Sequence, residues 1–148
     1  ADNKDNIHKV FHPEGGGLNP GVLNSEVIEQ VDASPPAGWY MGHFNNIEWT
    51  ESASTDVILT AYQIKQAVCA KINEKLTGST TIPTLVGGAE IKDLLIDDAV
   101  VQSDGSNDNF LTDPDATPDC ASCDGKPMLC VKDSALDAYA FYAVMADR

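Results

Sequence analysis

The strongest periodic signal in the chain lies between Ser54 and Gly78. Five apolar positions recur at intervals of four, three, four and four residues, which is one stripe of a 3.6-residue helix: Val57, Ala61, Ile64, Val68 and Ile72. Thr55 and Asp56 join Ser54 as candidate N-caps, and Gly78 suits a left-handed helix end. The spacing therefore predicts a helix of about twenty residues with this stripe turned to the core.

Shorter apolar segments predict strands on both sides of this helix. Residues 39–49 are rich in aromatic residues and predict a strand or hairpin, and residues 80–86 and 90–96 predict short strands or a strand and a turn. Residues 128–132 and 138–146 predict two closing strands. Both alternating sets in 138–146 are apolar, so we expect both faces of that strand to be partly covered.

Together these elements predict an α+β fold. We expect one main helix packed on a small antiparallel sheet, with strands mostly from the C-terminal half, long loops and a disulfide-stapled C-terminal region. The chain contains no internal repeat and predicts a single domain over 1–148. Residues 1–38 predict an extended, loop-rich N-terminal segment, and 39–148 predict the core of helix and sheet.

Composition and charge restrict the partners of the chain. Of 148 residues, 43% are hydrophobic, which is enough for a globular core. The formal net charge of −14 repels phosphate backbones, so we expect no nucleic-acid partner, and it disfavours anionic lipid. No apolar run reaches the roughly 18–20 residues of a membrane span. Because the chain opens with Ala1 rather than Met, we expect a targeting segment upstream.

Four cysteines indicate disulfides and an oxidising compartment: Cys69, Cys120, Cys123 and Cys130. Sequence leaves all three pairings open, and we favour one bond from Cys69 to the C-terminal cluster and one inside that cluster. A bond from Cys69 to Cys130 would close a loop of about 60 residues, worth roughly 4 kcal/mol. The alternatives are a zinc site and a redox pair at Cys120 and Cys123, whose acidic neighbours would raise a thiol pKa and oppose activation.

Signals for catalysis are weak. Gly15–Gly17 lacks the Lys-Ser/Thr of a phosphate loop, and the chain has neither Gly-x-Ser-x-Gly nor His-Glu-x-x-His. His8, His12 and Glu14 are a weak candidate for a divalent metal. We therefore expect no catalytic residue and no enzymatic activity.

An acidic segment is the best candidate for a bound ion. Residues 104–109 place oxygen-bearing side chains around a glycine, as calcium-binding loops do, and further aspartates follow. The alternative is a solvated loop whose Asp, Asn and Gly residues only form turns. The candidate calcium ligands are Asp104, Asp108, Asp113 and Asp115.

Three segments carry a family resemblance: Val10–Gly17, Gln66–Leu76 and the C-terminal cysteine region. With the helix-and-sheet layout of residues 39–148, they resemble the globular head of type IV pilin-like proteins, including the pseudopilins of type II secretion. The resemblance implies an upstream apolar helix that anchors the full-length protein in the bacterial inner membrane and joins it to other pilin-like subunits. It places the head in the periplasm or outside the cell.

The resemblance implies a structural subunit of a type IV pilus or secretion filament, and it favours calcium in the acidic loop. Major pilin, minor pilin and pseudopilin remain open. Two other functions are considered. One is a secreted, calcium-dependent binding module, with Trp39, Tyr40 or Trp49 at the contact unless these residues pack in the core. The other is a small secreted enzyme or redox protein with a free thiol at Cys120 or Cys123.

Overall fold

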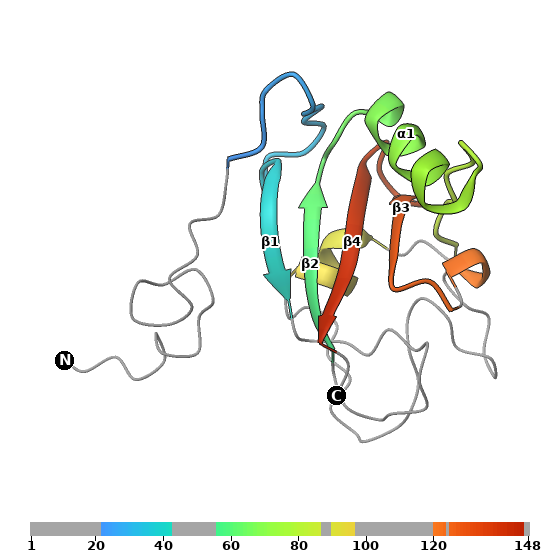
Figure 1. The fold of residues 1–148 in the computed structure, drawn as a ribbon. Coiled ribbons are helices and arrows are strands. Elements are labelled where there is room, and N and C mark those ends of the chain that lie inside the picture. Colours follow the sequence, from blue (N-terminus) through green and yellow to red (C-terminus); the bar gives the residue numbers. More distant parts are fainter. Residues whose placement is uncertain (1–21, 43–55, 87–89, 97–119, 124, 147–148) are drawn as a thin grey trace.

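The computed structural model describes residues 22–42, 56–86, 90–96, 120–123 and 125–146. These residues form a four-stranded antiparallel sheet with the strand order β1-β2-β4-β3. A helix, α1, lies against one face of the sheet, and a short helical segment, η2, lies against the other (Figure 1). This arrangement is the α+β fold that the hydrophobic pattern predicts.

The helices and strands follow one another along the chain in a simple order. Two strands precede the helix, and two follow it. They are β1 (Gly38–Gly42), β2 (Val57–Tyr62), α1 (Gln66–Thr77), η2 (Lys92–Ile96), η3 (Ala121–Cys123), β3 (Met128–Lys132) and β4 (Tyr139–Ala146). The expectation that the strands come mostly from the C-terminal half is therefore wrong, since β1 and β2 supply half of the sheet.

The predicted twenty-residue helix is wrong in its first half. Residues Val57–Tyr62 form β2, a central strand that pairs with β1 on one side and β4 on the other. Ile58 and Tyr62 belong to the core on the η2 face, whereas Ala61 belongs to the core on the α1 face. Because both faces are covered, every residue of the strand except Thr60 is apolar or aromatic, and a subset of these positions matches helical spacing by coincidence.

The helix itself begins at Gln66. Lys65 precedes it in extended conformation without a side-chain cap, and Gly78 ends it with φ of 80°, as the sequence predicts. The most buried positions of α1 are Cys69 and Asn73, which lie one turn apart on the same side. Val68 and Ile72, from the predicted stripe, are only half-buried and flank this pair.

The two closing strands match the prediction closely. The strand β3 covers the predicted 128–132, and β4 begins one residue inside 138–146. Both faces of β4 are covered, with Tyr142 in one core and Tyr139 in the other. By contrast, residues 80–86 form only an isolated bridge from Thr84 to Lys132, and residues 92–96 are helical. The prediction of strands is therefore wrong for both segments. Residues 43–49 of the predicted 39–49 hairpin lie outside the described residues.

The sheet separates two hydrophobic clusters. On the η2 face the buried residues are Ile58, Tyr62, Leu85, Ile91, Leu95, Cys120, Cys123, Leu129, Val131, Ala138, Ala140 and Tyr142. On the α1 face they are Ala61, Ile64, Cys69, Cys130 and Tyr139. The larger cluster therefore lies on the face away from the helix.

Two close contacts hold η2 against the sheet. A Cβ atom at Gly42 would overlap the backbone carbonyl of Leu95, so glycine is required where β1 meets η2. The buried Asp133 carboxylate accepts the Ile91 backbone N–H at 2.8 Å and also closes the β3–β4 turn, where it accepts the Ala135 and Leu136 N–H groups. Within the described residues, no helix has the length and apolar content to cross a bilayer.

Candidate functional site

Both disulfides involve the C-terminal cysteine region. Cys69 of α1 is bonded to Cys130 of β3, and Cys120 is bonded to Cys123 across η3, with Cα atoms 5.4 Å apart in each pair. The preference for one bond from Cys69 to the cluster and one inside it is confirmed. All four cysteines are therefore oxidised, so no thiol is left for zinc, and the free thiol expected of a redox protein at Cys120 or Cys123 is not present.

The Cys120–Cys123 pair is also inaccessible. The two residues are only 3% and 1% exposed and belong to the hydrophobic cluster on the η2 face. Among the residues that the structure describes, no group of three or more His, Cys, Asp or Glu side chains comes together to hold a metal ion. The two disulfides link α1 to β3 and close the short η3 segment inside the cluster on the η2 face.

The side chain of Asn73 also joins α1 to β3, beside the disulfide between Cys69 and Cys130. The buried Asn73 side chain accepts the Cys130 backbone N–H at 2.8 Å and donates to the Cys130 carbonyl at 2.8 Å and to the Thr81 carbonyl at 3.0 Å. An amide carries the same donor and acceptor as a peptide group, so Asn73 occupies the place of a neighbouring strand at this edge. The helix is thus held to Cys130 by one covalent bond and two hydrogen bonds.

A second buried amide fixes the segment before β1. Gln63, between β2 and α1, accepts the backbone N–H groups of Val31 and Asp32 at 2.6 and 2.8 Å. Its amide nitrogen donates to the carbonyls of Asp32 and Pro35 at 2.7 and 2.8 Å. Gln63 has φ of 60°, and this local cost is offset by four hydrogen bonds in a fully buried position.

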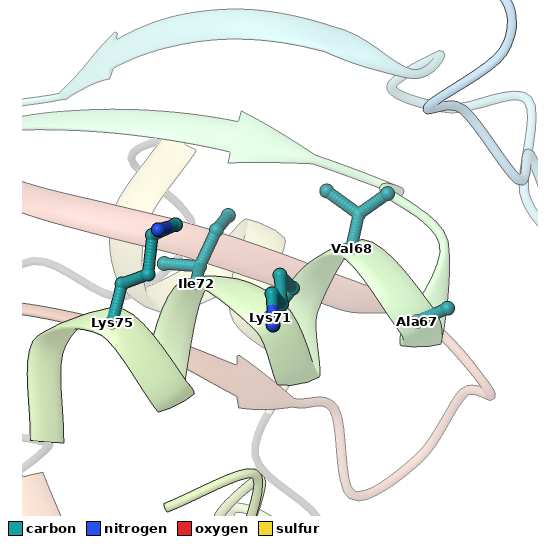
Figure 2. A pocket seen from close by; sticks show the side chains of 5 residues that line it. All are labelled: Ala67, Val68, Lys71, Ile72 and Lys75. Atoms are coloured by element: carbon teal, nitrogen blue, oxygen red, sulfur yellow. The ribbon is translucent and has the colours of Figure 1, made fainter. Parts of the chain in front are cut away.

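A shallow pocket of about 430 Å³ runs along α1. Its lining is almost entirely apolar and comes from Ala67, Val68 and Ile72 and from the side chains of Lys71 and Lys75 (Figure 2). Lys71 is ion-paired with Glu74 one turn further along the exposed surface. The two lysines therefore line the pocket mainly with their methylene chains, and the pocket offers an apolar contact surface.

Three titratable groups near the sheet have shifted pKa values. Burial raises the pKa of the Tyr142 phenol well above its usual value, and this hydroxyl donates to the Lys126 carbonyl at 3.0 Å. Burial also raises the pKa of Tyr40. The pKa of half-buried Lys132 is raised mainly by its hydrogen bond to Asp137, at 2.7 Å. Each group belongs to a packing or surface contact.

The structure tests only part of the predicted site. The candidate calcium ligands Asp104, Asp108, Asp113 and Asp115 lie outside the described residues. His8, His12, Glu14 and Trp49 also lie outside them. Trp39 packs against the cluster on the α1 face and Tyr40 against the cluster on the η2 face, and both are half-buried.

Comparisons with protein-family models, with curated proteins and with solved structures find no match to this chain.

Sequence reasoning missed the buried amides Asn73 and Gln63. For Asn73 a signal exists, because it follows Cys69 by four positions and so shares its helical face, where a polar residue needs partners. For Gln63 the signal is weaker. Its partners lie about thirty positions earlier, in a segment without periodicity.

Proposed function

We propose that this chain is the globular head of a pilin-like or pseudopilin filament subunit, a structural protein without catalytic activity. The observation that carries the proposal is the link between α1 and the edge strand β3 through Cys69–Cys130, in a fold of one helix on a four-stranded antiparallel sheet. The resemblance drawn from the sequence implies a head with one helix, an antiparallel sheet and a C-terminal cysteine region.

Two further features support a structural role. Three of the described polar side chains that are deeply buried serve the fold: Asn73 closes an edge, Gln63 holds a loop and Asp133 closes a turn. The pocket on α1 offers an almost entirely apolar surface, which suits contact with another protein chain. In this proposal the head contributes contacts and stability, and assembly depends on a helix encoded upstream.

The experiment that tests the proposal is to determine the coding sequence upstream of Ala1 and to locate the full-length product. We expect a processing site followed by about 20 apolar residues with a glutamate near their start. We expect the product in the inner membrane before assembly and in filaments sheared from the cell surface afterwards. A cleaved signal peptide with a small-residue cleavage site, and a freely secreted product, would contradict the proposal and favour a secreted binding module.

A further inference from the structure

Three charged side chains meet between the segment before β1 and the start of η2. The ammonium nitrogen of Lys92 lies 2.8 Å from Oε2 of Glu90 and 3.8 Å from Oδ2 of Asp32. The three side chains are only 25 to 31% exposed, and the Glu90 oxygen itself is buried. One amine is therefore held beside two carboxylates at a place that water reaches only partly.

Two other lysine–carboxylate pairs among the described residues are simpler. Lys71 pairs with Glu74, and Lys132 pairs with Asp137, and in each pair one side chain is more than half exposed. Exposed pairs of this kind are hydrated and contribute little to stability. The Lys92 cluster differs from them because it contains a second carboxylate and because all three of its side chains are mostly covered.

The backbone is fixed on both sides of this cluster. The buried amide of Gln63 bonds to the N–H and the C=O of Asp32, at 2.8 and 2.7 Å. Ile91, directly before Lys92, is fully buried and donates its N–H to the Asp133 carboxylate at 2.8 Å. The amine and the carboxylate thus approach each other from two anchored segments, and groups held in this way react with a high effective concentration.

We propose that Lys92 and Asp32 form an intramolecular isopeptide bond, with Glu90 transferring the proton. Glu90 accepts a proton from the Lys92 ammonium, and the freed amine attacks Cγ of Asp32. A C–N bond forms, and the C–O bond to one carboxylate oxygen breaks. That oxygen leaves as water, with the proton from Glu90 and one further proton from the amine. The products are one amide and one water, so atoms and charge balance, and Glu90 returns to its carboxylate form.

The bond would give the first half of the fold a covalent link. The two disulfides join α1 to β3 and close η3, whereas the buried amide of Gln63 holds the segment before β1 by hydrogen bonds. An amide between positions 32 and 92 closes a loop of sixty positions and ties this segment to η2. The inference goes beyond the proposed function, because it concerns a modification within the head and holds whether or not an upstream helix builds a filament.

Intact mass spectrometry of the reduced full chain tests the proposal. We expect a mass below the sequence mass by one water molecule. Lys92→Arg keeps the positive charge, but a guanidinium stays protonated and does not attack a carboxyl group, so this variant should have its full sequence mass. Lys132→Arg changes a lysine of another carboxylate pair and is the matched control, expected to keep the deficit. A full sequence mass in the unmodified chain, or a deficit that persists in Lys92→Arg, overturns the proposal.

Peptide mapping of the unmodified chain locates the bond without any variant. Trypsin does not cleave after a lysine whose amine is acylated, so the peptides that contain Asp32 and Lys92 should be recovered as one branched species. Fragmentation of this species in the mass spectrometer identifies the two linked residues. A water loss that maps to any other position overturns the proposal.

Glu90→Gln tests the proton transfer. The amide keeps the size of the glutamate side chain but does not take up the proton, so the bond should form at least about a hundredfold more slowly. Mass spectra of samples taken at intervals after cell-free synthesis measure the rate. Glu74→Gln removes a carboxylate from another lysine pair and is the control, expected to leave the rate unchanged. Bond formation at the same rate in Glu90→Gln and in the unmodified chain overturns the role proposed for Glu90.

Discussion

At the scale of single residues, two amide side chains act as extra peptide groups. Asn73 presents a donor and an acceptor to the backbone of Cys130, and Gln63 presents both to the segment before β1. Both residues are fully buried. A buried amide is stable only when its hydrogen bonds are made, so each side chain fixes the position of the chain segment that it contacts.

Asn73→Ala is expected to destabilise the protein by about 3 kcal/mol, because it leaves backbone groups of Cys130 buried without partners. Urea unfolding with both disulfides intact measures this loss as a lower midpoint. Leu76→Ala on the same helix is the control, since Leu76 is 42% exposed and its loss should cost well under about 1 kcal/mol. Equal losses for the two variants would show that Asn73 matters only for helix formation.

Tyr142 gives the protein a weakness at alkaline pH. Its pKa is raised in the folded state, so above about pH 10 the unfolded chain loses the phenolic proton while the folded chain keeps it. The unfolded state then binds fewer protons, and stability falls as pH rises from about 10 toward the folded pKa. Below pH 10 this group contributes no pH dependence.

Tyr142→Phe is therefore expected to flatten the fall of the melting temperature between about pH 9.5 and 11. It should also lower stability at pH 7 by about 1 kcal/mol, through loss of the hydrogen bond to the Lys126 carbonyl. Absorbance titration at alkaline pH follows the four tyrosines, and Tyr142→Phe should remove one that ionises only on unfolding. Tyr139→Phe is the control, and the same flattening in this variant would contradict the assignment to Tyr142.

At the scale of elements, the error in the predicted helix has a clear physical cause. Residues Val57–Tyr62 lie in a central strand covered on both faces, and such a strand lacks the alternation that identifies a half-exposed one. Val57, Ala61 and Ile64 then match a helical stripe that continues into the real helix. The β-branched residues in the first half of the predicted helix favour a strand. The apolar stripe is long, however, and on its own it favours a helix.

The elements with local signals were predictable. Gly78 ends α1, and the apolar runs of β3 and β4 are bounded by turn residues close to their ends. The contacts of Asn73, Gln63 and Asp133 could not be predicted from the sequence, because each contact depends on a partner far away in the chain. The helical form of 92–96 likewise depends on its packing beneath β1, where Gly42 allows Leu95 to approach.

The two disulfides should contribute unequally to stability. Cys69–Cys130 spans 61 positions, so its removal frees a long loop in the unfolded chain and should cost about 4 kcal/mol. Cys120–Cys123 spans three positions and should cost about 2 kcal/mol. Guanidinium unfolding of the two double-alanine variants measures both costs. A larger loss for the Cys120→Ala, Cys123→Ala variant would show that packing in the η2-face cluster outweighs loop entropy.

At the scale of the whole molecule, the two faces of the sheet are covered by different elements. The larger cluster lies on the η2 face, and α1 covers the β3 and β4 side of the opposite face, where the disulfide and Asn73 hold it (Figure 1). The net charge of −14 disfavours close approach by a second copy, and the pocket on α1 offers an almost entirely apolar contact surface.

The excess of acidic residues also bears on the prediction that the acidic segment binds calcium. We expect Ca²⁺ to bind the 104–115 segment with a Kd of roughly 10⁻⁴ to 10⁻³ M, the range of extracellular sites. At 100 times the Kd, it should stabilise the protein by about 2.7 kcal/mol. Isothermal titration gives the affinity, and thermal unfolding in Ca²⁺ or Mg²⁺ of equal ionic strength separates specific binding from screening of the net charge.

The decisive variant is Asp104→Asn with Asp108→Asn, which removes two carboxylates from the predicted loop and should weaken binding about tenfold or more. Its matched control is Glu26→Gln with Asp137→Asn, which changes the net charge by the same amount at two exposed positions. If calcium acts only by reducing repulsion across an acidic molecule, the two double variants will lose affinity equally. Loss in the loop variant alone, with no stabilisation by Mg²⁺, is the outcome expected of a site built from carboxylates at fixed spacing.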